Sequence, residues 1–263
     1  MITNSSTSIH DLEDKLLKDY ATTFKIPSVD ANIIISNNME QSYRSVFGVR
    51  INEKPCPRNI ESYHGLTLQP VDDSEIFTIL INARYIDPSM QNINWVSTLI
   101  HEVTHVYDFK EYYCLISPQT YDELFDDSLH TIFNNWSEFH AMAIGHYFLR
   151  KHTFSDFKDT YHAYTIRDYE LPSAATQMAT EFYKTNDIKR LRYVVMRFLG
   201  RLAVWQYLYP DVFNKPYISQ ITKTNPWMAD LFNILTQYDS VSSIFPSFDD
   251  IQQILEQHLS IAE

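Results

Sequence analysis

Two histidines four residues apart, on a stretch with strong helical character, constrain this chain more than any other feature. The segment Trp95–Phe109 contains His101, Glu102 and His105 in the pattern HExxH. On an α-helix, residues i and i+4 are neighbours on one face, so the two imidazoles can bind one metal ion. Mostly apolar residues on both sides indicate a buried helix. We therefore predict a metal-binding helix, the alternative being a core helix whose histidines bond only to backbone groups.

A catalytic zinc site takes three protein ligands and leaves one position to water, so a third ligand must come from elsewhere. Glu138 is the best candidate. We expect an Asn or Ser in 134–137 to cap a helix that has Glu138 in its first turn, where the helix dipole or a metal would stabilise the carboxylate. Four other carboxylates are possible ligands, although such an acidic run is more typical of a solvated surface: Asp122, Glu123, Asp126 and Asp127.

Three polar residues near the candidate ligands are open to more than one interpretation. His140 should point away from Glu138, whereas His146 shares its helical face. His146 then lines the cleft or, more simply, lies on the helix surface. Asp108 shares the face of the two HExxH histidines, so it either orients one of them or is solvated.

These residue types predict hydrolysis of peptide bonds by a metal-activated water. Zinc lowers the pKa of bound water to about 7 and polarises the attacked carbonyl, while Glu102 accepts the proton as general base. A donor to the developing oxyanion is also needed. The sequence offers five candidates and favours none of them: Tyr112, Tyr113, His146, Tyr161 and His162.

Residues 63–150 resemble the gluzincin-type metallopeptidases, and within them the ImmA/IrrE-like group. In that group a strand ending in Ile-Asn precedes a helix that opens with Thr-Leu before HExxH, as Ile81-Asn82 and Thr98-Leu99 do here. The third-ligand helix there has a Glu followed by small and aromatic residues, as in Glu138–Ala143. Two features depart from the relatives: Met142 stands where thermolysin-like members have Asp, and no helix-turn-helix segment is evident.

The resemblance implies a zincin-like fold with one zinc ion bound by His101, His105 and Glu138. It also implies that Glu102 is the general base, and it suggests a regulatory protein as the substrate. Two other functions remain open: a zinc-binding interaction or structural protein without turnover, and a metal hydrolase that does not cut peptides. The same ligands could also hold iron, cobalt or manganese.

The fold expected is α+β, with a small amino-terminal sheet, an active-site helix and a mainly helical carboxy-terminal half. Only 4 glycines in 263 residues favour helices over a turn-rich all-β fold and exclude glycine-rich phosphate loops. We expect a metallopeptidase core in residues 1–150 and a helical subdomain packed on it in residues 151–263. Strands are predicted at Val29–Ser36, Ser45–Ile51 and Glu75–Asn82, and helices at Ser8–Phe24, Asp187–Tyr209, Pro226–Tyr238 and Phe248–Ser260.

Two of these elements could contribute directly to substrate or anion binding. Glu75–Asn82 is either a core strand or an edge strand that holds an extended peptide substrate. Along Asp187–Tyr209, an arginine stripe formed by Arg190, Arg197 and Arg201 is expected to be solvated or paired with the acidic surface rather than to form an anion site.

Charge and composition exclude several other function classes. A net charge of −12 argues against direct nucleic-acid binding. The amino terminus lacks the features of a signal peptide, and no apolar run has the length of a membrane span. We therefore expect a cytoplasmic protein with a protein or peptide substrate, no membrane contact, and reduced thiols at Cys56 and Cys114. The oligomeric state stays open.

Overall fold

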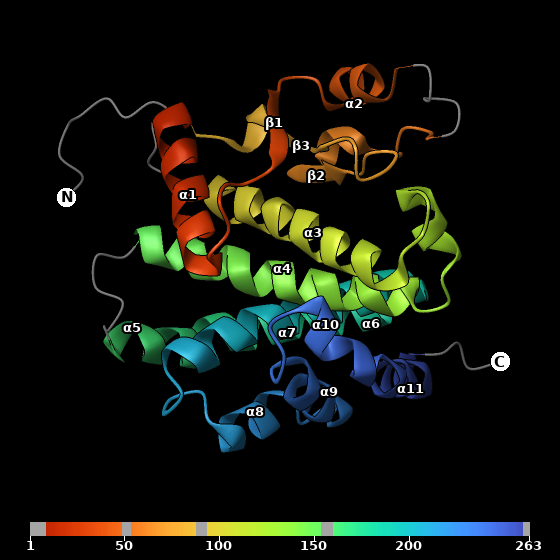
Figure 1. Ribbon diagram of the computed structural model, residues 1–263. Helices are drawn as coiled ribbons and strands as arrows, with labels where there is room; N and C mark the ends of the chain where they lie inside the picture. Colours follow the sequence, from red (N-terminus) through yellow and green to blue (C-terminus); the bar gives the residue numbers. More distant parts are fainter. Residues whose placement is uncertain (1–8, 49–53, 88–93, 154–159, 260–263) are drawn as a thin grey trace.

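The structure, a computed structural model, describes residues 9–48, 54–87, 94–153 and 160–259. It is an α+β protein in which a small mixed sheet packs on a larger set of helices (Figure 1). The described strands are β1 (Ala31–Ser36), β2 (Gly65–Leu68) and β3 (Phe77–Asn82). The described helices are α1 (Ile9–Phe24), α2 (Met39–Phe47), α3 (Trp95–Ile116), α4 (His130–Thr153), α5 (Thr160–Thr165), α6 (Leu171–Lys184), α7 (Ile188–Leu208), α8 (Lys215–Ile221), α9 (Trp227–Leu235), α10 (Val241–Ile244) and α11 (Phe248–Leu259).

The sheet has the order β1-β3-β2, so β3 is the central strand. β1 runs parallel to β3, with Ile33 opposite Ile79, and β2 runs antiparallel, with Leu66 opposite Leu80. All six residues of β3 are buried, in keeping with its run of apolar side chains. The strand predicted at Glu75–Asn82 is therefore confirmed as a core strand, and its interpretation as an edge was wrong. β1 and β2 are the two edge strands beside it.

The amino-terminal third contains one clear error of the sequence analysis. The segment predicted as a strand at Ser45–Ile51 begins inside α2, and residues 49–53 lie outside the described part of the chain. The helix is capped by Asn38, whose side chain accepts a hydrogen bond from Gln41 N. Met39, Tyr43 and Phe47 recur every four residues and are buried together, which is a helical and not a strand period.

The remaining predicted elements are found close to their expected bounds. β1, α1, α7, α9 and α11 match the predictions to within a few residues, although the proposed Ser8 cap of α1 lies outside the described residues. Cys56 and Cys114 are free thiols. Among the residues that the structure describes, none of the helices has the length and apolar content that a membrane crossing requires.

Helices α3, α4 and α7 form successive layers beneath the sheet (Figure 1). Two glycines allow these layers to approach closely. A Cβ at Gly145 would lie 2.6 Å from the Ser97 carbonyl oxygen on α3, and one at Gly200 would lie 2.6 Å from the Phe139 carbonyl oxygen on α4. The main hydrophobic core continues through all the layers, from Leu16 to Leu259, and α4 itself runs across residue 150.

Candidate metal centre

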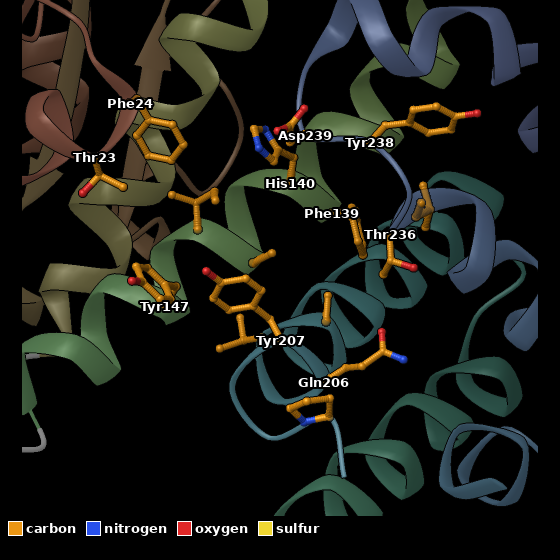
Figure 2. A pocket seen from close by; sticks show the side chains of 16 residues that line it. Thr23, Phe24, Phe139, His140, Tyr147, Gln206, Tyr207, Thr236, Tyr238 and Asp239 are labelled. Carbon is orange, nitrogen blue, oxygen red and sulfur yellow. The ribbon is translucent and has the colours of Figure 1, made fainter. Parts of the chain in front are cut away.

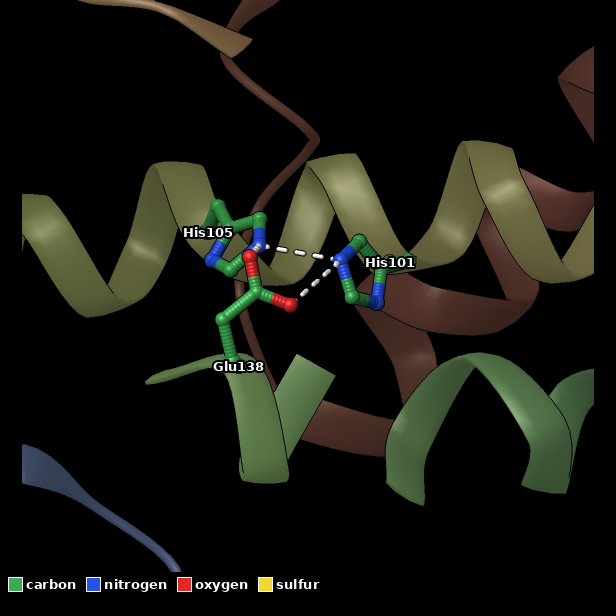
Figure 3. Close-up of side chains that lie close together, drawn as sticks. All are labelled: His101, His105 and Glu138. Atoms are coloured by element: carbon green, nitrogen blue, oxygen red, sulfur yellow. Dashed lines mark hydrogen bonds and ion pairs between the residues drawn. The ribbon is translucent and has the colours of Figure 1, made fainter. Parts of the chain in front are cut away.

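Side chains from α3 and α4 converge at a single point between the two helices. His101 and His105 project from α3 and Glu138 projects from α4 toward them (Figure 3). The two histidine Nε2 atoms are 3.0 Å apart. Glu138 Oε2 lies 3.6 Å from His101 Nε2, and Glu138 Oε1 lies 3.7 Å from His105 Nε2. The structure thus brings together the three residues that the sequence analysis selected as ligands.

Glu138 occupies a different part of its helix from the one predicted. α4 begins at His130, so Glu138 lies about two turns inside the helix and not in its first turn. The apolar residues Ile132, Phe133 and Trp136 are buried at helical spacing and extend the helix toward its amino end. Ser137, one of the expected caps, uses its hydroxyl in the site instead. The helix dipole therefore does not stabilise the negative charge of Glu138, because the dipole acts only on groups in the first turn of a helix.

A hydrogen-bonded chain behind the site fixes the tautomer of His105. Ser137 Oγ donates to Asp108 Oδ2 at 2.7 Å and lies 2.7 Å from His105 Nδ1. A hydroxyl has one proton, so Ser137 must accept from His105 Nδ1–H. His105 Nε2 then keeps its lone pair and faces the other ligands. Asp108 orients the ligand histidine through Ser137, and it also accepts from His140 Nδ1 at 2.9 Å.

His101 has a comparable arrangement. Its ring hydrogen-bonds the backbone of Ala141, and since Nε2 faces His105, Nδ1 is the nitrogen left for that bond. Burial, together with the neighbouring His105 ring and the positive charge of Arg197, lowers the pKa of His101 well below 6.5. Its Nε2 is therefore an unprotonated acceptor at neutral pH.

The donor set fits a tetrahedral metal ion. Two imidazole Nε2 atoms and a carboxylate face one another, and Glu138 Oε2 is buried with no hydrogen-bond partner among the described residues. Ligand atoms around zinc at about 2.0–2.2 Å lie about 3.3–3.5 Å apart in a tetrahedron. The two Nε2 atoms, 3.0 Å apart, are close to that spacing, and with one carboxylate oxygen taken from Glu138 the three ligand atoms all lie within 4.8 Å of one another. Within the described ranges, this is the cluster of metal-binding side chains that the geometry brings together.

Glu102 lies beside the ligands and is held from β2. Thr67 Oγ1 is 2.8 Å from Glu102 Oε2 and 3.0 Å from the Glu102 carbonyl oxygen. Burial raises the pKa of Glu102 above 4.5, although the hydrogen bond to Thr67 opposes the shift. Gly65 permits this contact, because a Cβ there would lie 2.8 Å from both Glu102 Cγ and Thr98 Cγ2.

The ligands and Glu102 open onto a cavity of about 830 Å³. Residues 62–67, which include most of β2, line one side, and α7 lines another. Tyr193 and Arg197 of α7 both line the cavity, and Arg197 Nη1 donates to the Tyr193 hydroxyl. The sequence analysis missed Tyr193, although its position between Arg190 and Arg197 on one helical face was visible in the sequence.

Of the five candidate oxyanion donors, the structure places one on the wall of the cavity. His146 lines the cavity, so its cleft interpretation is correct, and burial with three arginine charges lowers its pKa to about 3. The Tyr112 hydroxyl donates to Asp127 and the Tyr113 hydroxyl to the Gln119 carbonyl. Neither of these tyrosines lines the cavity, nor does His162, which packs against Trp205; the side chain of Tyr161 lies outside the described residues.

In the arginine stripe the predicted ion pair is found for one of the three members, and the other two are partly exposed without a carboxylate partner among the described residues. Arg190 is exposed and forms an ion pair with Glu181 at 3.6 Å, as expected. Arg197 lines the metal cavity, and Arg201 is half-buried with its Nε shielded from solvent. The stripe faces α6 and the cavity because the opposite face of α7 carries the apolar residues that pack on α4.

A second cavity of about 640 Å³ lies on the other side of α4 (Figure 2). Its lining is mainly apolar and includes Phe24, Phe139 and Tyr147. His140 lines this cavity and Glu138 lines the other one, so the two side chains point to different sides of α4, as predicted. Through Asp108 and Ser137, His140 is connected to the candidate ligand His105.

No model of a protein family, no curated protein and no solved structure matches this chain in the comparisons with known proteins.

Proposed function

We propose that this protein is a zincin-like metallopeptidase that binds one zinc ion through His101, His105 and Glu138. The observation that carries the proposal is the convergence of two histidine Nε2 atoms and the Glu138 carboxylate next to a buried glutamate, at the base of an open cavity. A histidine pair that served only the core would bond to backbone or hydroxyl groups through both ring nitrogens. Here each histidine uses one nitrogen for such a bond and leaves Nε2 to the cluster.

Zinc, when bound, supplies a Lewis acid that lowers the pKa of water and polarises a carbonyl. Glu102 accepts the proton of the attacking water and passes it to the leaving amine. Thr67 holds the Glu102 carboxylate during both transfers through its 2.8 Å hydrogen bond. Burial of Glu102 raises its pKa toward the operating pH, which suits a group that must both accept and release a proton.

Tyr193 is the donor proposed for the developing oxyanion. It lines the cavity, and burial raises its pKa, so the phenol stays protonated at neutral pH. Arg197 donates to its hydroxyl oxygen and thereby orients the phenol. His146 is the second donor on the cavity wall.

β2 supplies a place for an extended peptide. It pairs with β3 along one side, and residues 64–67 line the cavity. A substrate segment added to the other side of β2 would run past Glu102 and the ligands, with backbone hydrogen bonds that do not depend on its sequence.

The first test measures metal content and turnover in matched variants. The parent should hold about one zinc ion per chain by plasma mass spectrometry, and Glu138→Ala should lose most of it. Glu102→Gln should keep the zinc and lose cleavage of a peptide library, since it removes the base and spares the ligands. Glu256→Ala, an exposed glutamate on α11, is the control and should change neither.

Two outcomes would contradict the proposal. A parent protein that binds no zinc when zinc is supplied would return the two histidines to a structural role. Zinc binding without cleavage of any peptide by the parent would instead favour a binding protein that has the site but no turnover.

A further inference from the structure

One face of α7 forms a cationic surface along the wall of the metal cavity. Arg190, Tyr193, Arg197 and Arg201 follow one another at intervals of three and four residues and therefore share that face. The guanidinium groups of Arg190 and Arg197 lie 5.5 and 5.1 Å from the centre of the Tyr193 ring. The tyrosine thus lies between two cations, in a chain whose net charge is −12.

This face also borders a smaller pocket of about 310 Å³ between α6 and α7. Arg190, Tyr193 and Arg197 line both the pocket and the metal cavity, so the two spaces adjoin along α7. Arg201 lines the smaller pocket only. From α6 the pocket receives Gln177 and Glu181.

Only one of the three arginines in this pocket forms an ion pair with a described residue. Glu181 pairs with Arg190 at 3.6 Å. No described carboxylate lies within ion-pair distance of Arg197 or Arg201, and Arg201 Nε is buried without a hydrogen-bond partner. Burial and the neighbouring Arg197 both lower the pKa of Arg201, which reflects the cost of holding two cations together out of water.

We propose that this pocket binds the carboxylate of an acidic substrate side chain, so that the peptides cut by the enzyme carry Glu or Asp close to the scissile bond. The inference rests on the proposed peptidase function. An Arg guanidinium presents paired N–H donors that match the two oxygens of a carboxylate. The volume of the pocket is at the lower end of the range for ligand sites, which begins at about 300 Å³. The pocket therefore has room for one amino-acid side chain.

The experiment measures binding separately from cleavage. Zinc-loaded Glu102→Gln protein is immobilised and exposed to pools of capped peptides in which one position is Glu, Gln or phosphoserine and the others are randomised. At one position, Glu should be enriched over Gln by about tenfold or more, the effect of one charge-assisted hydrogen bond. Equal enrichment of Glu and Gln at every position would overturn the inference, and so would a stronger enrichment of phosphoserine.

Variants of α7 then test which residues are responsible. Arg201→Gln, made in the Glu102→Gln background, should bring the Glu to Gln ratio close to one, and Arg197→Gln should reduce it. Arg192→Gln is the matched control, because Arg192 is on the same helix and also has a buried, unpartnered Nε, but lines neither space. A preference that survives both Arg201→Gln and Arg197→Gln would show that the pocket is not its source.

The two proposals fail in different ways. Selective binding of Glu peptides by the inactive variant, without cleavage of those peptides by the parent, would leave the anion pocket in place and remove the peptidase. Cleavage of peptides by the parent with no preference for acidic residues would instead support the peptidase and contradict the anion pocket.

Discussion

Substitution of Ser137 by Ala tests the hydrogen-bonded chain behind the metal site. Ser137 is 1% exposed and touches neither the proposed metal nor the substrate cavity. Its hydroxyl accepts from His105 Nδ1 and donates to Asp108 Oδ2, each at 2.7 Å. The change removes both bonds and leaves the three ligands present. Any loss of metal affinity then measures how much the orientation of His105 contributes.

The expected loss is 10- to 100-fold in zinc affinity, about 1.4–2.8 kcal/mol, as is typical when a hydrogen-bond partner of a ligand histidine is removed. Without Ser137, the His105 ring can rotate and can place its proton on Nε2, which blocks the lone pair. Asp108 keeps its 2.9 Å hydrogen bond to His140. The substitution should also cost about 1–3 kcal/mol of folding free energy, because Asp108 Oδ2 loses a donor in a buried position.

Zinc affinity is measured by competition with a chromophoric chelator, and unfolding is measured on the zinc-free protein. Thr104→Val is the matched control: Thr104 is fully buried on α3 beside His105, but its hydroxyl donates to the Ile100 carbonyl and not to a ligand. The control should lose stability and keep its zinc affinity. If Ser137→Ala bound zinc within twofold of the parent, the assigned tautomer and the role of the chain would both be wrong.

Three other substitutions have clear expected outcomes. Gly65→Ala should lower peptide cleavage at least tenfold with zinc retained, since its Cβ would lie 2.8 Å from Glu102 Cγ; an unchanged rate would mean that β2 moves freely. Gly200→Ala should overpack α7 against α4, which typically costs about 1–3 kcal/mol of folding free energy. Each kcal/mol should lower the melting temperature by about 2–4 °C. Burial of Asp19 opposes ionisation, but hydrogen bonds from Lys151 and His152 outweigh it and hold the pKa below 3.8. The stabilisation is thus complete above about pH 5 and is lost as the pH falls through the folded pKa. Asp19→Asn should then cost about 1 kcal/mol in urea unfolding at pH 7 and almost nothing near pH 2.

The clustering of the two histidines could be predicted from the sequence because it needs only local geometry. The spacing of His101 and His105 fixes their common face on any helix. Glu138 was selected from the character of its helix, and the structure brings its carboxylate next to the two histidines, although its place in the helix differs from the prediction. The error arose because Asn134 and Ser137 are good capping residues, whereas the buried Ile132 and Phe133 extend the helix and override that signal.

The opposite wall of the cavity could not be predicted, because it depends on contacts between segments far apart in the chain. Thr67 meets Glu102 across 35 residues, and nothing in the short β2 segment indicates that contact. Tyr193 and Arg197 lie more than 50 residues after Glu138 in the sequence. A charged stripe on a helix is usually solvated, and here it faces inward only because α6 covers that side of α7.

The scarce glycines show how the fold sets the geometry of the site independently of any metal. Three of the four in the chain lie where an element packs against α3 or α4, and each leaves no room for a Cβ. Gly145 allows α4 to approach α3 beside His101, Gly65 brings β2 against Glu102, and Gly200 lets α7 pack on α4 beside Phe139. These close contacts in the core, together with the hydrogen bonds that link Asp108, Ser137 and His105, hold the three candidate ligands close enough to share one ion. Small metal-dependent domains instead use the metal to make their core. We therefore expect the zinc affinity of this site to come from an arrangement that exists before zinc binds. The metal-free protein would then be less stable, because its candidate ligand atoms repel one another.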